Sequence, residues 1–197
     1  MTNEDSMAIA QDNMKVSNMI LLGATGRNLG KTTLAIHIIE ELKERVPIIA
    51  LKVITVRDHG DICPRGGKGC GICHGLKDCF DIREELGDGG KDTMLLRKAG
   101  AKRVYLIRSL KDHVQDAIEE AMSYVPEGHL VICESNSVRT AVDPGVFIMI
   151  KSPGGEENYK PTAKEVISKA DFVMEQKDAS SEALWERIME VVESVES

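Results

Sequence analysis

The stretch Gly23-Ala-Thr-Gly-Arg-Asn-Leu-Gly-Lys-Thr-Thr33 decides the fold of this chain. An apolar run, Met19 to Leu22, precedes it, and apolar residues at helical spacing follow it from Leu34 to Leu42. A strand, a glycine-rich loop and a helix in that order predict a phosphate-binding P-loop. Backbone N–H groups of such a loop converge on the phosphates, and the start of the helix adds the positive end of its dipole.

Each part of this loop has an expected contact. Lys31 is expected to reach the β- and γ-phosphates as a point charge, and the Thr32 hydroxyl to lie on Mg²⁺. The usual pattern is G-x-x-x-x-G-K-[ST], whose first glycine falls on Thr25, but Gly23 and Gly26 flank that position and still permit a sharp turn. The predicted nucleotide-binding residues are Gly26, Arg27, Asn28, Leu29, Gly30, Lys31, Thr32 and Thr33. The alternative, an ordinary strand-to-helix turn with a chance lysine, explains the clustered glycines poorly.

Composition limits the classes to which the chain can belong. Its 197 residues favour one α/β domain, and a hydrophobic content of 42% supports a core that is mostly aliphatic, since aromatic residues make up only 4%. The net charge of −7 argues against general nucleic-acid binding. The polar start of the chain does not resemble a signal peptide, and the sequence contains no apolar run long enough for a membrane span. We therefore expect a soluble cytoplasmic protein with neither nucleic-acid nor membrane partners.

Apolar runs bounded by Gly, Pro or charge alternate with helical patterns along the chain. This alternation predicts an α/β fold: a single doubly wound, mainly parallel sheet with helices on both faces. Residues 1–17 are expected to form a flexible N-terminal arm, residues 18–197 one P-loop NTPase domain, and residues 57–90 a cysteine-rich insertion loop. The expected strands are 18–24, 48–54, 103–108, 129–134, 146–150 and 171–174, and the expected helices are 31–45, 92–99, 110–125, 161–169 and 184–195.

Polar residues follow several of these strands, where ligands collect in an open α/β sheet. Glu134 closes an apolar strand and is expected to help hold Mg²⁺, the alternative being a solvated strand-end charge. Asp58 and Asp61 are candidates for a second carboxylate that holds Mg²⁺ or positions water, the alternative being simple loop acids. Asn136 either contacts a ligand or forms a turn. Lys31, Glu134 and Asp58 are therefore the candidate catalytic residues. Base contacts are expected from residues 151–159.

Four of the five cysteines cluster with the spacing C-x6-C-x2-C-x5-C. The C-x2-C pair can grip one ion, so the cluster predicts a Zn²⁺ site or an iron–sulfur cluster, and the spacing does not choose between them. The alternatives are free thiols, a redox disulfide, or three thiolates with His74 or His59 as the fourth ligand. Cys133 lies inside an apolar run and is expected to be a buried small hydrophobe. The predicted ligands are Cys63, Cys70, Cys73 and Cys79.

The chain resembles the molybdopterin-guanine dinucleotide biosynthesis protein B family, within the SIMIBI class of P-loop NTPases. The likeness rests on Gly30-Lys-Thr-Thr33, on Lys52 before an Asp/His-bearing loop, on Gly90-Lys-Asp-Thr93, and on Glu134. It covers about residues 18–151. The chain departs from the family pattern in its four-cysteine insertion and in the Ser-Asn-Ser that follows Glu134.

The resemblance implies GTP binding, weak hydrolysis that depends on Mg²⁺, and a homodimer. It further implies a helper role in attaching a nucleotide to molybdopterin or in delivering the finished molybdenum cofactor to enzymes or assembly proteins. By the same likeness, Lys31 and Thr32 take the phosphate and Mg²⁺ positions, and Asp92 and Glu134 take the positions of the family's acids.

Two other functions compete with this one. An ATP-dependent ligase similar to dethiobiotin synthetase would activate a small carboxylate or carbamate, but only Arg57 and Lys52 suggest a carboxylate-binding set. A metallochaperone or redox-sensing nucleotide switch would use the cysteine loop as its working part. A preference for ATP favours the ligase, GTP favours the cofactor helper, and coupling between metal and nucleotide favours the switch.

Overall fold

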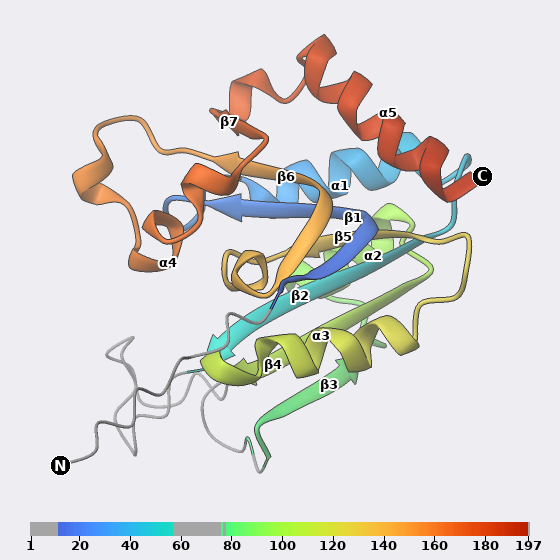
Figure 1. Ribbon diagram of the computed structural model, residues 1–197. Coiled ribbons are helices and arrows are strands. Elements are labelled where there is room, and N and C mark those ends of the chain that lie inside the picture. The colour runs from blue at the N-terminus through green and yellow to red at the C-terminus, as the bar shows by residue number, and fades with distance from the viewer. Residues whose placement is uncertain (1–11, 57–75, 77, 197) are drawn as a thin grey trace, which may run out of the picture.

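The computed structural model of the protein describes residues 12–56, 76 and 78–196. Within these residues, seven strands form one sheet in the order β3-β4-β2-β5-β1-β6-β7 (Figure 1). Neighbouring strands are parallel except β3, which runs antiparallel to β4. The strands are β1 (Met14–Ala24), β2 (Ile48–Val56), β3 (Phe80–Glu84), β4 (Arg103–Leu110), β5 (Leu130–Glu134), β6 (Val142–Ile150) and β7 (Phe172–Met174).

Helices cover both faces of the sheet, which confirms the predicted doubly wound α/β fold. The α-helices are α1 (Lys31–Leu42), α2 (Asp92–Ala99), α3 (Val114–Ser123), α4 (Pro161–Lys164) and α5 (Glu182–Glu196). Short 3₁₀ helices are η1 (Lys111–His113), η2 (Ser137–Thr140), η3 (Glu156–Asn158), η4 (Ile167–Lys169) and η5 (Gln176–Asp178). Among the described helices, none is long and apolar enough to cross a membrane.

Strand β1 lies inside the sheet, and its side chains alternate between two cores. Ile20 and Leu22 pack in the core beneath α1, α2 and α5, whereas Met19 and Leu21 pack in the core beneath α3. All four side chains are fully buried. A strand covered on both faces needs apolar residues at consecutive positions, which explains the continuous apolar run before the glycine-rich loop.

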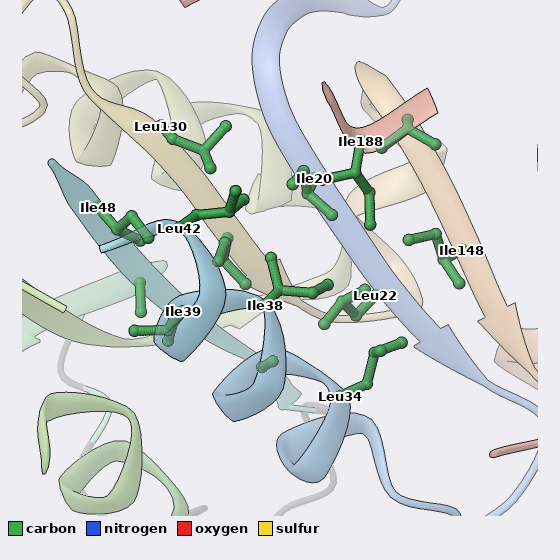
Figure 2. Packing of buried hydrophobic residues seen from close by; sticks show 14 of the residues in the cluster. Ile20, Leu22, Leu34, Ile38, Ile39, Leu42, Ile48, Leu130, Ile148 and Ile188 are labelled. Atoms are coloured by element: carbon green, nitrogen blue, oxygen red, sulfur yellow. The ribbon is translucent and has the colours of Figure 1, made fainter. Parts of the chain in front are cut away.

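Helix α1 is fixed to the sheet by one apolar stripe. Leu34, Ile38 and Leu42 recur at a spacing of four residues and are buried against the strands (Figure 2). The opposite face of the sheet is covered by α3, whose buried residues Val114, Ala117, Ile118 and Ala121 are also one helical stripe. Because one stripe faces the sheet, the start of α1 is held at the carboxyl end of β1.

The register of the central strands brings separate segments together at one edge of the sheet. Leu22 of β1 is the register partner of Glu134 at the end of β5, and Glu134 is also the partner of Lys52 on β2. Ala24, which ends β1, is paired with Ile150, which ends β6. Residues that follow β1, β5 and β6 therefore start from the same edge, as expected for parallel strands.

Several strands are longer than their apolar runs indicated. Strand β1 begins at Met14, so residues 14–17, which were expected in the N-terminal arm, are in the sheet, and residues 14–16 pair with β6. Strand β4 continues to Leu110, so Ser109 is a fully buried strand residue. The helix that was expected to follow directly begins only at Val114, after the 3₁₀ helix η1.

Strand β3 lies within the stretch 57–90, which was expected to be a loop throughout. Phe80 and Ile82 alternate along it and pack against the core beneath α3. Asp81 accepts hydrogen bonds from Arg108 of β4 at 2.7 and 2.5 Å, and the Arg108 side chain is almost completely buried. This ion pair and the apolar alternation together fix β3 at the edge of the sheet.

Candidate functional site

The loop between β1 and α1 bends through residues 25–30 and ends in a left-handed residue. Gly30 has φ of 88° and precedes α1, and no side chain in the described part of the chain caps this helix start. Asn28 has φ of 54°, in the left-handed region that asparagine tolerates better than most residues. The first N–H groups of a helix have no partner within the helix, so this start can bind an anion.

Thr25, which takes the position of the first glycine of the usual motif, has a structural role. It is fully buried, and its hydroxyl accepts a hydrogen bond from the Ser152 N–H at 2.8 Å. Its backbone N–H donates to the Ile150 carbonyl at 2.9 Å, and its carbonyl accepts from the Lys160 N–H at 2.9 Å. Thr25 does not adopt a positive φ, so the backbone does not need glycine there. The threonine instead ties the loop to the segment after β6.

Asn136 holds the end of β1 from the other side. Its Oδ1 accepts from the Ala24 N–H at 2.8 Å, and its Nδ2 donates to the Ala24 carbonyl at 2.9 Å. Nearby, a Cβ on Gly23 would lie 2.9 Å from side-chain atoms of Met149 and Phe147, so this glycine permits a close approach. Asn136 also precedes η2 and lines the pocket described below, so the expected ligand contact stays a prediction, and the backbone clamp is an additional role.

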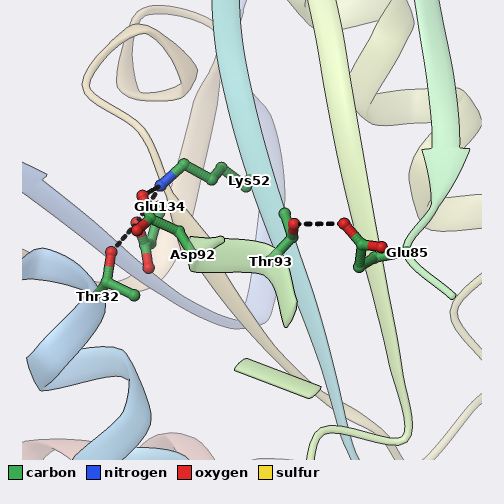
Figure 3. Close-up of polar contacts among 6 residues, drawn as sticks. All are labelled: Thr32, Lys52, Glu85, Asp92, Thr93 and Glu134. Atoms are coloured by element: carbon green, nitrogen blue, oxygen red, sulfur yellow. Dashed lines mark hydrogen bonds and ion pairs between the residues drawn. The ribbon is translucent and has the colours of Figure 1, made fainter. Parts of the chain in front are cut away.

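Glu134 meets the start of α1 directly. Its Oε2 accepts a hydrogen bond from Thr32 Oγ1 at 3.1 Å, and it also pairs with Lys52 Nζ at 3.1 Å (Figure 3). The Glu134 side chain is only 1% exposed, and its Oε1 has no hydrogen-bond partner among the described residues. Lys52 in turn pairs with Asp92 at the start of α2. A buried carboxylate oxygen without a partner is costly, so this group has acceptor capacity for a ligand.

Burial and the neighbouring carboxylates have opposite effects on the pKa values of the two lysines of the site. Burial lowers the pKa of Lys31, against the opposing effect of the Glu134 carboxylate. Burial also acts to lower the pKa of Lys52, but its charge interactions and hydrogen bonds with Glu134 and Asp92 outweigh burial, and the pKa is raised. Lys52 is therefore firmly held as an ammonium ion between two carboxylates.

These residues line a pocket of about 780 Å³ at the carboxyl edge of the sheet. Of the predicted nucleotide-binding residues, all but Gly26 line it; Gly26 faces the Leu29 side chain. The walls also include Lys160, Thr162 and Gln176, whereas residues 151–159, the expected base contacts, do not line it. The lining consists of residues 27–33, 52–55, 92, 134–137, 160, 162 and 176.

Several expected site residues lie outside the described part of the chain. These are Asp58, His59, Asp61, Cys63, Cys70, Cys73 and His74. Cys79 is described and is exposed with a free thiol, next to β3. Cys133 is fully buried, as predicted, and burial raises the pKa of its thiol. Among the described residues, no three His, Cys, Asp or Glu side chains gather as a metal centre.

Sequence reasoning gave Lys52 too small a role. It was noted through the family resemblance and as a possible carboxylate-binding residue, but not as the partner of Glu134 and Asp92. The sequence did contain a signal for this role, because Lys52 is the single charged residue in the apolar run Ile48–Val56. A charged residue in a buried strand needs a partner of opposite charge. Gln176, whose side chain lies against Gly30, carried no such signal.

Comparisons with family models, with curated proteins and with solved structures found no match for this chain. The resemblance stated from the sequence therefore remains a prediction, and the function has to be argued from the geometry of the pocket.

Proposed function

We propose that the protein binds a purine nucleoside triphosphate with Mg²⁺ in this pocket and hydrolyses it slowly. The observation that carries the proposal is the convergence of Lys31, Thr32 and Glu134 at the uncapped start of α1. This arrangement supplies a cation, free backbone donors and a metal-side carboxylate within one pocket. Phosphoryl transfer requires mainly positioning and charge stabilisation, and these groups provide both.

The α1 start and Lys31 would hold the phosphates. The N–H groups at the start of a helix point along its axis and favour negative charge. Lys31, the first residue of α1, adds a partly desolvated ammonium, whose attraction for phosphate is stronger than in water. Asn136 and Ser152 tie the start of the loop that leads into α1 to neighbouring segments. Both phosphate-binding groups are therefore positioned before a ligand arrives.

The oxygen donors fit Mg²⁺. Thr32 Oγ1 and Glu134 Oε2 are 3.1 Å apart, and the second oxygen of Glu134 has no partner in the described part of the chain. Mg²⁺ prefers oxygen ligands, keeps several waters and commonly takes only one or two protein groups beside phosphate. Thr32 and Glu134 would hold the ion, and when bound it would neutralise charge on the phosphate oxygens.

The residues that could contact the base lie on a different side of the pocket. Lys160, Thr162 and Gln176 follow β6 and β7 and lie across the loop from Glu134. The sequence resemblance favours GTP, and a side-chain amide such as that of Gln176 can hydrogen-bond either purine. We therefore propose GTP, and the comparison of GTP with ATP in one titration decides between them.

The proposed biological role is assistance in the assembly or insertion of the molybdenum cofactor. It comes from the resemblance, and one structural observation supports it: of the three residues that carry the likeness from separate segments, Lys52 pairs with both Asp92 and Glu134. The partners would be molybdenum enzymes or assembly proteins. Lys52 is paired with two carboxylates, so it is not a ready site for a substrate carboxylate, which disfavours the ligase.

A metal-dependent nucleotide switch is the second candidate, because of where the cysteine segment joins the sheet. Val56 is the register partner of Leu110, and the Leu110 N–H donates to the Cys79 carbonyl at 2.8 Å. The two described ends of this segment thus flank Leu110 of β4, at the edge that bears the pocket. Nucleotide affinity measured before and after chelation tests this candidate, because coupling between two sites is reciprocal.

Substitution of Lys31 tests the first proposal. Loss of a hydrogen bond to a charged group costs about 1.5–3 kcal/mol, so Lys31→Ala should weaken Mg²⁺–GTP binding roughly ten- to hundredfold. Lys98→Ala is the matched control, because Lys98 is half-exposed on α2 and pairs with Asp88 away from the pocket. Isothermal titration should show wild-type affinity for the control. Equal affinities for wild type and Lys31→Ala would overturn the assignment.

A further inference from the structure

Glu134 is neutralised by a neighbour from the adjacent strand. Lys52 is its register partner on β2, and Lys52 Nζ lies 3.1 Å from Glu134 Oε2. The Glu134 side chain is 1% exposed and the Lys52 side chain 19% exposed. A carboxylate so deeply buried needs a compensating cation. In the ligand-free protein, the Lys52 ammonium provides this compensation.

The same oxygen belongs to the proposed metal site. Glu134 Oε2 accepts from Thr32 Oγ1 as well as from Lys52, so both bonds converge on one atom (Figure 3). A divalent ion held by Thr32 and Glu134 would lie next to the ammonium and be repelled by it, strongly so away from water. The ion and the Lys52 ammonium therefore compete for Glu134.

Lys52 has a second partner, so its ammonium can move away from Glu134 and still be paired. Asp92, in the first turn of α2, also pairs with its ammonium. The Asp92 side chain is about half exposed, so it is solvated whether or not Lys52 is shared with Glu134. A lysine that moved off Glu134 would keep one carboxylate and would not be left as an uncompensated buried charge. It would also stay in the pocket wall, beside Lys31.

We propose that Lys52 is a placeholder cation: its ammonium neutralises Glu134 in the ligand-free protein, and a divalent metal ion displaces it to Asp92. This inference rests on the proposed function, because it assumes the metal site at Thr32 and Glu134. It makes Lys52 a positioning residue that pairs with the buried carboxylate and orients it until the metal arrives.

The test is direct binding of Mn²⁺ to the nucleotide-free full chain, followed by electron paramagnetic resonance of the free ion. Lys52→Met removes the competing charge and keeps most of the side-chain volume. Its Mn²⁺ affinity should rise by roughly tenfold, since a nearby like charge is removed from a poorly solvated site. Lys52→Arg retains the charge and should bind Mn²⁺ as weakly as the wild type. Circular dichroism of the methionine variant, compared with the wild type, establishes that it is folded before its affinity is interpreted.

Lys31→Met is the matched control for charge acting through space. Lys31 brings the same charge into the same pocket but, in the described part of the chain, is not hydrogen-bonded to Glu134. Its gain in Mn²⁺ affinity should be smaller than that of Lys52→Met. An equal gain in the two variants, or no gain in Lys52→Met, would overturn the placeholder role. Glu134→Gln tests the proposed metal site separately from the placeholder role. If this variant binds Mn²⁺ as the wild type does, the proposed metal site itself is wrong.

Discussion

On the β1–β6 side of the pocket, neutral hydrogen bonds hold backbone groups together, whereas on the β2–α2 side charged side chains hold one another. Asn136 and Thr25 fix the loop between β1 and α1 through backbone atoms of β1 and the segment after β6. Glu134, Lys52 and Asp92 are fixed by ion pairs. A bound ligand does not replace these hydrogen bonds to the backbone, but a metal ion can displace the Lys52 ammonium. We therefore expect the loop to keep its contacts when a ligand binds, and the ion pairs of the carboxylate side to change.

Breaking the neutral clamp should have the largest effect on stability. Asn136→Ala leaves both the N–H and the carbonyl of Ala24 without their side-chain partner. With two hydrogen bonds lost near a buried strand end, we expect a decrease of about 3 kcal/mol in the free energy of unfolding. Urea denaturation measures it. Asn136→Asp keeps the acceptor and loses the donor, so it should fall between wild type and alanine; an alanine variant as stable as the wild type would contradict the clamp.

A charged contact at the edge of the sheet gives the next largest effect and adds a pH dependence. Hydrogen bonds from Arg108 hold the pKa of Asp81 below its ordinary value of 3.8. The stabilisation is therefore present above that value and is lost as the pH falls through the lower folded-state pKa. Asp81→Asn should lower the unfolding free energy by about 2 kcal/mol at neutral pH, because Arg108 loses a charged partner.

The wild type and Asp81→Asn should accordingly begin to converge in stability as the pH falls below about 4. Convergence is complete only below the lowered folded-state pKa of Asp81. Thermal unfolding from pH 7 to pH 2.5 follows this convergence. A constant difference across that range would show that charge is not what fixes β3 to β4.

Removing the Thr25 hydroxyl should have a smaller effect on the neutral side. Thr25→Val keeps the shape but leaves the Ser152 N–H without its acceptor, and we expect a loss of about 1 kcal/mol. Thr25→Ser retains the hydroxyl and is the control. Chemical denaturation compares the two variants, and a valine variant more stable than the serine one would mean that packing, not this hydrogen bond, decides the residue.

The smallest expected change is at Thr93, next to Asp92. Its hydroxyl donates to Glu85 Oε2 at 2.7 Å, and the other oxygen of Glu85 accepts from the Gly87 N–H. Glu85 is partly exposed, so water can replace the lost bond, and Thr93→Val should cost about 0.5 kcal/mol. Hydrogen exchange at Gly87 should nevertheless speed up. Unchanged exchange would indicate that Glu85 holds this turn without help from α2.

The sequence was sufficient to predict the fold and the placement of Lys31, Thr32 and Glu134 at one edge of the sheet. Lys31 and Thr32 were placed by the loop motif, and Glu134 by the rule that ligand-binding residues follow parallel strands. Both predictions use local spacing and a general property of the fold. The Thr32–Glu134 contact at 3.1 Å joins a residue predicted from the loop motif to one predicted from its place at the end of a strand.

The parts that sequence reasoning missed depend on contacts between distant segments. Lys52 meets Glu134 only because β2 and β5 are adjacent and in register, and spacing along the chain does not reveal register. Strand β3 was hidden in a glycine-rich stretch, although Phe80 and Ile82 show the period of two. Thr25 looked like a defect in the motif because its partner, Ser152, is far away in the sequence.

The most direct test of the account is equilibrium binding of a fluorescent GTP analogue to the wild-type chain and to Glu134→Gln, each with and without Mg²⁺. The account predicts saturable binding that Mg²⁺ strengthens in the wild type. It also predicts that the variant binds through the loop and Lys31 but loses the Mg²⁺ effect. Absence of saturable binding, or an equal Mg²⁺ effect in both proteins, would contradict the assignment of this pocket.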